Sequence, residues 1–81
     1  MKIQTGTIDL KHVKDFLISD DLYECQKLLK CCRQEIGLSQ ISFANLIGVS
    51  RKTLNYLESG KANLSRLQCN AIKYVLTNLK R

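Results

Sequence analysis

The sequence lacks the features on which several functional classes depend. It has no proline, a single histidine (His12) and no run of 18 consecutive apolar residues, so no transmembrane helix is expected. Residues 1–10 contain one lysine and no apolar run of signal-peptide length. No carboxylate pair, phosphate loop or pairing of nucleophile and base is visible, which leaves little for catalysis. We expect a soluble, cytoplasmic, non-enzymatic protein without a cofactor.

Cysteine is present, but its spacing is unlike that of a metal site. The four cysteines, Cys25, Cys31, Cys32 and Cys69, include no C-x-x-C pair. Cys25 and Cys32 lie seven residues apart, on one face of a predicted helix, and reduced cysteine is a common small core residue. We therefore expect buried or half-buried free thiols rather than a metal centre, in a reducing compartment.

Acidic residues are scarce in the second half of the chain. Residues 1–38 contain six Lys/Arg and six Asp/Glu, whereas residues 39–81 contain seven Lys/Arg and one acid, Glu58. The whole net charge of +6 therefore belongs to the second half. This asymmetry favours a polyanionic partner, most often nucleic acid. A solvated basic surface without a partner is the alternative.

Apolar residues recur at three- and four-residue steps, a pattern typical of helices. Because the chain has no proline, we place the helix ends from glycines and capping residues. Residues 2–8 alternate like a short strand or form a loose start. The expected helices are 10–18, after a possible Asp9 cap, 21–36, 40–47 between Ser39 and Gly48, 51–59 between Ser50 and Gly60, and a last helix capped by Asn63 with the apolar stripe Leu64, Leu67, Ala71, Ile72, Val75 and Leu79.

The charges of the 51–59 helix are opposite to those that its dipole favours. Arg51 and Lys52 open the helix, and Glu58 closes it. A helix carries partial positive charge at its N-terminus, so each of these placements should cost a few tenths of a kcal/mol up to roughly 1 kcal/mol. Some interaction outside the helix is needed to compensate.

Two short helices joined by a tight glycine-containing turn form either a plain helical hairpin or a helix-turn-helix. The outer face of the second helix separates these alternatives. Once the inward Leu54 and Leu57 are set aside, the remaining face bears no acid and consists of Arg51, Lys52, Asn55, Tyr56 and Ser59. Such long hydrogen-bonding side chains are suited to reading base edges in the major groove.

Residues 28–76 resemble the Cro/C1-type (XRE-like) helix-turn-helix domains of phage repressors, restriction-modification controllers and antitoxins. The resemblance rests on the order and spacing of many short pieces. They are Arg33, Gly37-Leu38-Ser39-Gln40, Phe43-Ala44, Leu46-Ile47-Gly48-Val49-Ser50, Leu54, Leu57-Glu58-Ser59-Gly60-Lys61 and Asn63. The resemblance implies an all-α, lambda-repressor-like bundle of four to five helices, with a domain at 21–81 and the motif at about 39–58. Residues 1–20 depart from the family pattern, because they precede its usual first helix, and we expect them to form an extension that bears the short helix predicted at 10–18.

The resemblance also implies roles for individual residues. Gln40 is expected to bind a phosphate and brace the recognition helix, Ser50 to contact the DNA backbone, and Ala44 to be small where the motif helices cross. Arg51, Lys52 and Tyr56 would face bases, with Asn55 nearby, and Ser59 and Lys61 would hold phosphates. Arg33 would pair with an inward-facing Glu58. Helix capping alone would also account for Gln40 and Ser50, and solvent exposure for Asn55 and Tyr56.

The expected function is sequence-specific binding of double-stranded DNA by a small repressor that occupies a promoter in the nucleoid. A homodimer on a palindromic operator is expected, because one short motif makes few contacts. Family members often build the dimer with a further helix, so residues 1–20 are expected to help the last helix here. The alternative is an antitoxin whose main partner is a toxin and whose DNA binding is secondary.

Overall fold

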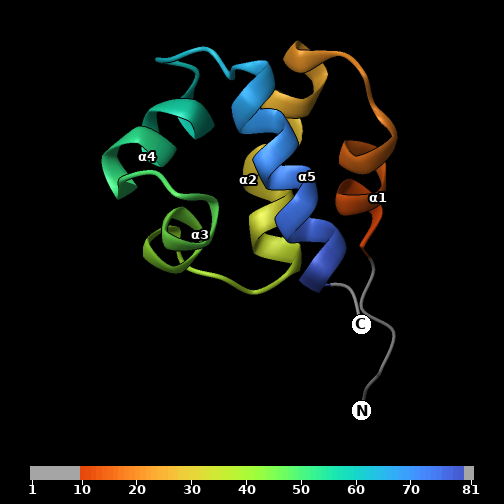
Figure 1. The fold of residues 1–81 in the computed structure, drawn as a ribbon, viewed down its shortest axis with the longest axis horizontal. Helices are drawn as coiled ribbons and strands as arrows, with labels where there is room; N and C mark the ends of the chain where they lie inside the picture. The colour runs from red at the N-terminus through yellow and green to blue at the C-terminus, as the bar shows by residue number, and fades with distance from the viewer. Residues whose placement is uncertain (1–9, 80–81) are drawn as a thin grey trace.

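The computed structural model describes residues 10–79, which form five helices and no strand. The all-α prediction is confirmed for this part of the chain, whereas the strand predicted at residues 2–8 and the Asp9 cap lie outside it. Helices α2 and α5 lie in the middle of the bundle, with α1 on one side and α3 and α4 on the other (Figure 1). The helices are α1 (Lys11–Ile18), α2 (Leu22–Glu35), α3 (Gln40–Ile47), α4 (Arg51–Ser59) and α5 (Arg66–Leu79).

The ends of α3 and α4 are set by local signals in the sequence. The Ser39 hydroxyl accepts from the backbone N–H of Ser42 at 3.1 Å, and the Ser50 hydroxyl accepts from that of Thr53 at 3.0 Å. Each cap satisfies one of the N–H groups that the first turn of a helix leaves free. Gly48 and Gly60 end the two helices at φ of 80° and 84°, a left-handed conformation that glycine adopts without steric cost.

The start of α5 differs from the prediction. The helix begins at Arg66 rather than after Asn63, and its cap is Ser65, whose hydroxyl accepts from the Gln68 N–H at 3.0 Å. The Gln68 side chain accepts in return from the Ser65 N–H at 3.0 Å. This reciprocal pair is a capping box, which satisfies more backbone groups than a single Asn63 cap.

The predicted stripe on α5 is also partly wrong, because packing against the other helices buries a different face of this helix. Leu67 is 80% exposed, while Cys69 and Leu76, which the stripe omitted, are buried beside the correctly predicted Ile72. Ala71 and Val75 are half-buried at the edge of this face. Leu64 is buried as predicted but precedes the helix. The apolar residues of α5 are therefore compatible with two alternative buried faces, and the fold buries the face that leaves Leu67 exposed.

One hydrophobic core joins all five helices. Helix α1 contributes Val13 and Phe16, both fully buried, so it is part of the same core as the predicted motif. Leu29 rather than Leu28 is the fully buried leucine of α2. The buried residues are Val13, Phe16, Cys25, Leu29, Cys32, Phe43, Ala44, Leu54, Leu57, Leu64, Cys69, Ile72 and Leu76.

The four cysteines are free thiols, three of them buried and Cys31 half-buried, as predicted. Burial, with a contribution from the Glu35 carboxylate, raises the pKa of Cys32 to about 12. Burial also raises the pKa of Cys69, and a hydrogen bond with the Cys25 side chain adds to this shift. Cys32 and Cys69 therefore stay protonated and act as small core residues.

Helix α1 is capped by a residue of another helix. Its N-cap position, Leu10, offers no side-chain acceptor. The Glu35 carboxylate, at the end of α2, accepts instead from the backbone N–H groups of His12 at 3.0 Å and Val13 at 3.1 Å. The same carboxylate contacts Nδ1 of the His12 ring. Glu35 thus serves as the N-terminal anion of α1 and fixes α1 to α2.

Residues 10–79 contain neither a helix that could span a membrane nor a cluster of metal-ligating side chains. No helix there has both the length and the apolar composition of a membrane span. No three His, Cys, Asp or Glu side chains of the same residues gather as metal ligands would.

Candidate nucleic-acid interface

Helices α3 and α4 form the predicted helix-turn-helix. Only Gly48, Val49 and Ser50 separate them, and the Val49 N–H donates to the Ala44 carbonyl at 3.0 Å across the turn. Ala44 is 1% exposed, consistent with a small residue where the two motif helices approach. Leu54 and Leu57 bury the inner face of α4, which leaves its opposite face to solvent.

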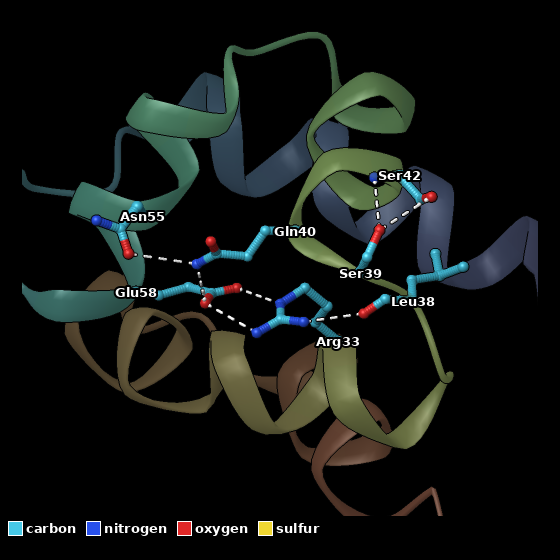
Figure 2. A network of polar contacts seen from close by, with 7 residues as sticks. All are labelled: Arg33, Leu38, Ser39, Gln40, Ser42, Asn55 and Glu58. Carbon is cyan, nitrogen blue, oxygen red and sulfur yellow. Dashed lines mark hydrogen bonds and ion pairs between the residues drawn. The ribbon is translucent and has the colours of Figure 1, made fainter.

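An ion pair ties α4 to α2. Arg33 Nε donates to Glu58 Oε2 at 2.7 Å, and Arg33 Nη2 donates to Glu58 Oε1 at 3.2 Å (Figure 2). The remaining guanidinium nitrogen, Nη1, donates to the Leu38 carbonyl at 2.9 Å, so Arg33 also holds the link between α2 and α3. The Arg33 and Glu58 side chains are only 12% and 3% exposed. The pair that the resemblance implied is therefore present as a fork-to-fork contact.

Gln40 extends this network from the start of α3. Its Nε2 donates to Glu58 Oε1 at 3.0 Å and to Asn55 Oδ1 at 3.3 Å (Figure 2). Glu58 consequently accepts from two helices, and Asn55 is oriented by the neighbouring helix rather than left free on the surface. Gln40 therefore braces α4 against α3.

The ring of Tyr56 is contacted by two lysines. Lys52 Nζ and Lys61 Nζ are each 5.8 Å from the centre of this ring, within the range of cation–π contacts. Tyr56 is half-buried, whereas Lys52 and Lys61 are exposed. The ring thus places one ammonium group from α4 and one from the following loop on the same side of the molecule.

The loop after α4 is held by a residue that sequence reasoning missed. Gln26 of α2 donates from Nε2 to the carbonyls of Leu57 at 3.0 Å and Ala62 at 2.6 Å. Its Oε1 accepts from the Leu64 N–H at 3.0 Å. These contacts join residues 31 to 38 positions apart, so no local pattern in the sequence could have indicated them.

The exposed face of this motif is basic and polar. Ser50, Arg51, Lys52, Asn55, Ser59 and Lys61 are all exposed, and Gln40 and Tyr56 are half-buried beside them. The only acid of residues 39–81, Glu58, points inward to Arg33. Within residues 10–79, neither Arg51 nor Lys52 forms an ion pair, so the N-terminus of α4 presents two cations and free N–H groups to an external anion.

Comparison with known proteins agrees with this geometry. A family model described as helix-turn-helix matches residues 29–72, just over half of the chain, from the middle of α2 into α5. Searches of curated proteins and of solved structures return no match. The matched residues include Arg33, Gln40, Glu58 and all of α3 and α4. The chain therefore belongs to the Cro/C1-type helix-turn-helix family, a family of DNA-binding proteins rather than of enzymes.

Proposed function

We propose that this protein is a sequence-specific regulator of transcription that binds double-stranded DNA and represses by occupying a promoter in the nucleoid. The observation that carries the proposal is the solvent face of α4, which presents Arg51, Lys52 and Asn55 without an exposed acid. The network of Arg33, Glu58 and Gln40 fixes this helix to its neighbours. A rigid, basic helix with exposed polar side chains has the properties needed for insertion into a major groove.

The residues of this face divide into two groups by the part of DNA that they contact. Arg51 and Lys52 match the acceptors of guanine, and Asn55 can pair with adenine, while Tyr56 can pack on a thymine methyl group. Phosphates are contacted by Ser50, Ser59 and Lys61, which lie around the ends of α4. A phosphate contact by the Gln40 side chain requires release of its 3.3 Å bond to Asn55, because both hydrogens of its amide donate within the protein. Base contacts give specificity, and phosphate contacts give affinity that falls with salt.

The two groups are distinguished by the variants Arg51→Ala and Lys61→Ala. The DNA sites come first from selection of bound duplexes in a random library at a stated salt concentration. Arg51→Ala should remove roughly 1 to 3 kcal/mol of discrimination between the selected and a scrambled duplex, because it removes a base contact. Lys61→Ala should weaken both duplexes alike and lower the log-log salt slope by about 0.9, because it removes a phosphate contact. Equal losses on both duplexes for Arg51→Ala would exclude its base-reading role.

The protein acts on DNA as a homodimer in this proposal. A nine-residue recognition helix contacts few base pairs, and tight specific binding by such motifs uses two half-sites about one DNA turn, roughly 34 Å, apart. The selected duplexes report on this directly, since a dimer selects an inverted repeat. A single unrepeated half-site, together with a one-to-one stoichiometry in solution, would contradict the dimer.

A further inference from the structure

Gln26 lies in the two turns of α2 that precede the matched segment, yet its side chain reaches into that segment. It contacts the end of α4 and the loop that follows, through the Leu57 carbonyl, the Ala62 carbonyl and the Leu64 N–H. The loop between these contact points contains Lys61. A part of the chain outside the matched segment therefore fixes the backbone beside an exposed cation of the candidate interface.

The loop is held from two directions. On its α4 side, the N–H groups of Lys61 and Ala62 both donate to the Tyr56 carbonyl, at 2.9 and 3.3 Å. On its α2 side, the Gln26 amide bonds both the Ala62 carbonyl and the Leu64 N–H. Lys61 is thus followed by Ala62, whose backbone N–H and carbonyl are both hydrogen-bonded. This restricts the direction in which the Lys61 side chain leaves the backbone.

Only an amide of this length satisfies all three backbone groups at once. The two carbonyls need donors and the N–H needs an acceptor, and a glutamine side chain carries both in one planar group. A methionine or leucine at position 26 has a similar volume and none of these hydrogen bonds. A surface cavity, lined in part by Gln26, Leu57 and Gly60, borders the side chain.

We propose that Gln26 is a positioning residue for DNA binding, which acts by holding Lys61 in the place where it meets a backbone phosphate. The inference rests on the proposed function, because it assumes that Lys61 contacts DNA. Gln26 itself touches no DNA in this proposal. Its effect on affinity therefore passes through Lys61, and this makes the inference testable separately from stability.

The test is a double-mutant cycle of Gln26→Met and Lys61→Gln, with binding to the selected duplex measured by fluorescence anisotropy across a salt series. Lys61→Gln alone should lower the log-log salt slope by about 0.9 and the affinity about tenfold at roughly 0.1 M salt. Gln26→Met alone should cause a smaller loss of the same kind, about three- to fivefold. In the Lys61→Gln background, Gln26→Met should have no further effect.

Two controls separate positioning from general damage. Gln34→Met changes an exposed glutamine of the same helix and should bind DNA like the wild type. Circular dichroism establishes that each variant is folded at the assay temperature, and Gln26→Leu replaces Gln26→Met if the latter is not.

Each outcome of the cycle has one meaning. A loss from Gln26→Met that is the same in both backgrounds would show a structural effect independent of Lys61 and would overturn the inference. An unchanged salt slope in Lys61→Gln, or wild-type binding by Gln26→Met, would overturn it as well. Absence of DNA binding by the wild-type protein would instead refute the proposed function.

Discussion

Glu58 has an environment that its position in the sequence does not suggest. It lies near the C-terminal end of α4, where a negative charge opposes the helix dipole, and it is the only acid among residues 39–81. Two nitrogens of Arg33 and the Gln40 amide compensate for this placement by donating to its carboxylate. At the other end of the helix, exposed Arg51 and Lys52 have no such partner in residues 10–79, which fits an end that meets an external anion.

Glu58→Ala should therefore destabilise the fold much more than Arg51→Ala. Removal of the carboxylate leaves the guanidinium of Arg33, 12% exposed, without its counter-ion, which costs about 3 to 5 kcal/mol when one partner of a buried pair is lost. Arg51 is exposed and its loss should change the free energy of unfolding by no more than about 0.5 kcal/mol. Urea denaturation of both variants measures the difference, and a reversed order would contradict this account of the pair.

Helix α1 depends on Glu35 for its N-terminal cap, and this contact makes its stability sensitive to pH. Burial raises the pKa of Glu35, but the hydrogen bonds from the His12 side chain and from the backbone N–H groups of His12 and Val13 outweigh that effect and lower the pKa below its ordinary value of 4.5. A carboxylate with a lowered pKa in the folded state stabilises the fold above its unfolded pKa. This stabilisation is lost as the pH falls through the folded pKa.

Glu35→Gln should accordingly lower the free energy of unfolding by about 1 to 2 kcal/mol at pH 7, because a charged acceptor at a helix N-terminus is lost. The difference from wild type should shrink as the pH falls below 4.5 and should be smallest below the lowered pKa of folded Glu35, where the wild-type carboxylate is itself protonated. Denaturation curves at pH 7 and pH 3 provide the comparison. A difference that is the same at both pH values would show that charge at Glu35 is not what caps α1.

The start of α5 offers a second test of a helix cap. Ser65→Ala should cost about 1 kcal/mol of stability, since it removes the hydroxyl that accepts from the Gln68 N–H. Asn63→Ala, two residues earlier and exposed, should be close to neutral. Thermal unfolding of the two variants distinguishes the cap in the structure from the one predicted, and a larger loss for Asn63→Ala would favour the predicted cap.

The sequence predicted elements well where the signals are local. Ser39, Gly48, Ser50 and Gly60 each act on groups within four residues, and all four mark the helix ends as expected. Prediction was wrong where two local signals compete, as at Asn63, because the Ser65 and Gln68 box lies two residues farther along. It was silent on Gln26 and on Glu35 as a cap, whose partners lie 22 to 38 residues away.

At the scale of the whole molecule, the hydrophobic core extends beyond the segment that the family model matches. The matched segment begins at residue 29, while Val13, Phe16 and Cys25 are fully buried in the same core as Leu29 and Ile72. Full burial of an apolar side chain stabilises a fold by roughly 1.5 to 3 kcal/mol. The burial of the three side chains before residue 29 is therefore large relative to the net stability of about 5 to 15 kcal/mol that is typical of a whole domain.

A chain that begins at residue 21 should consequently be far less stable than the 81-residue chain, or unfolded, despite retaining the whole helix-turn-helix. Phe16→Ala should lose about 3 to 5 kcal/mol by creating a core cavity, whereas Ile18→Ala, at a side chain 80% exposed, should lose little. Circular dichroism with urea titration ranks the three variants. Wild-type stability of the shortened chain would show that α1 is dispensable.

Some contacts of the candidate site could be predicted from the sequence, and others could not. The family resemblance was enough to imply the ion pair of Arg33 and Glu58 and the bracing by Gln40, because a resemblance supplies distant partners that periodicity cannot. The arrangement of Lys52 and Lys61 about Tyr56 depends on the path of the loop after Gly60, which long-range contacts set. The charge asymmetry correctly indicated that the excess of basic residues lies in the second half of the chain. It could not show that Lys52 and Lys61 contact the same aromatic ring, that of Tyr56.

The borrowed cap of α1 also bears on how the chain folds. An eight-residue helix without a side-chain cap of its own is unstable in isolation, because nucleation costs more than so few hydrogen bonds return. Its first turn is completed only when α2 has formed as far as Glu35. Helix α1 should therefore form together with its docking rather than before it, and exchange of the His12 and Val13 amides with solvent measures undocking of α1 from α2.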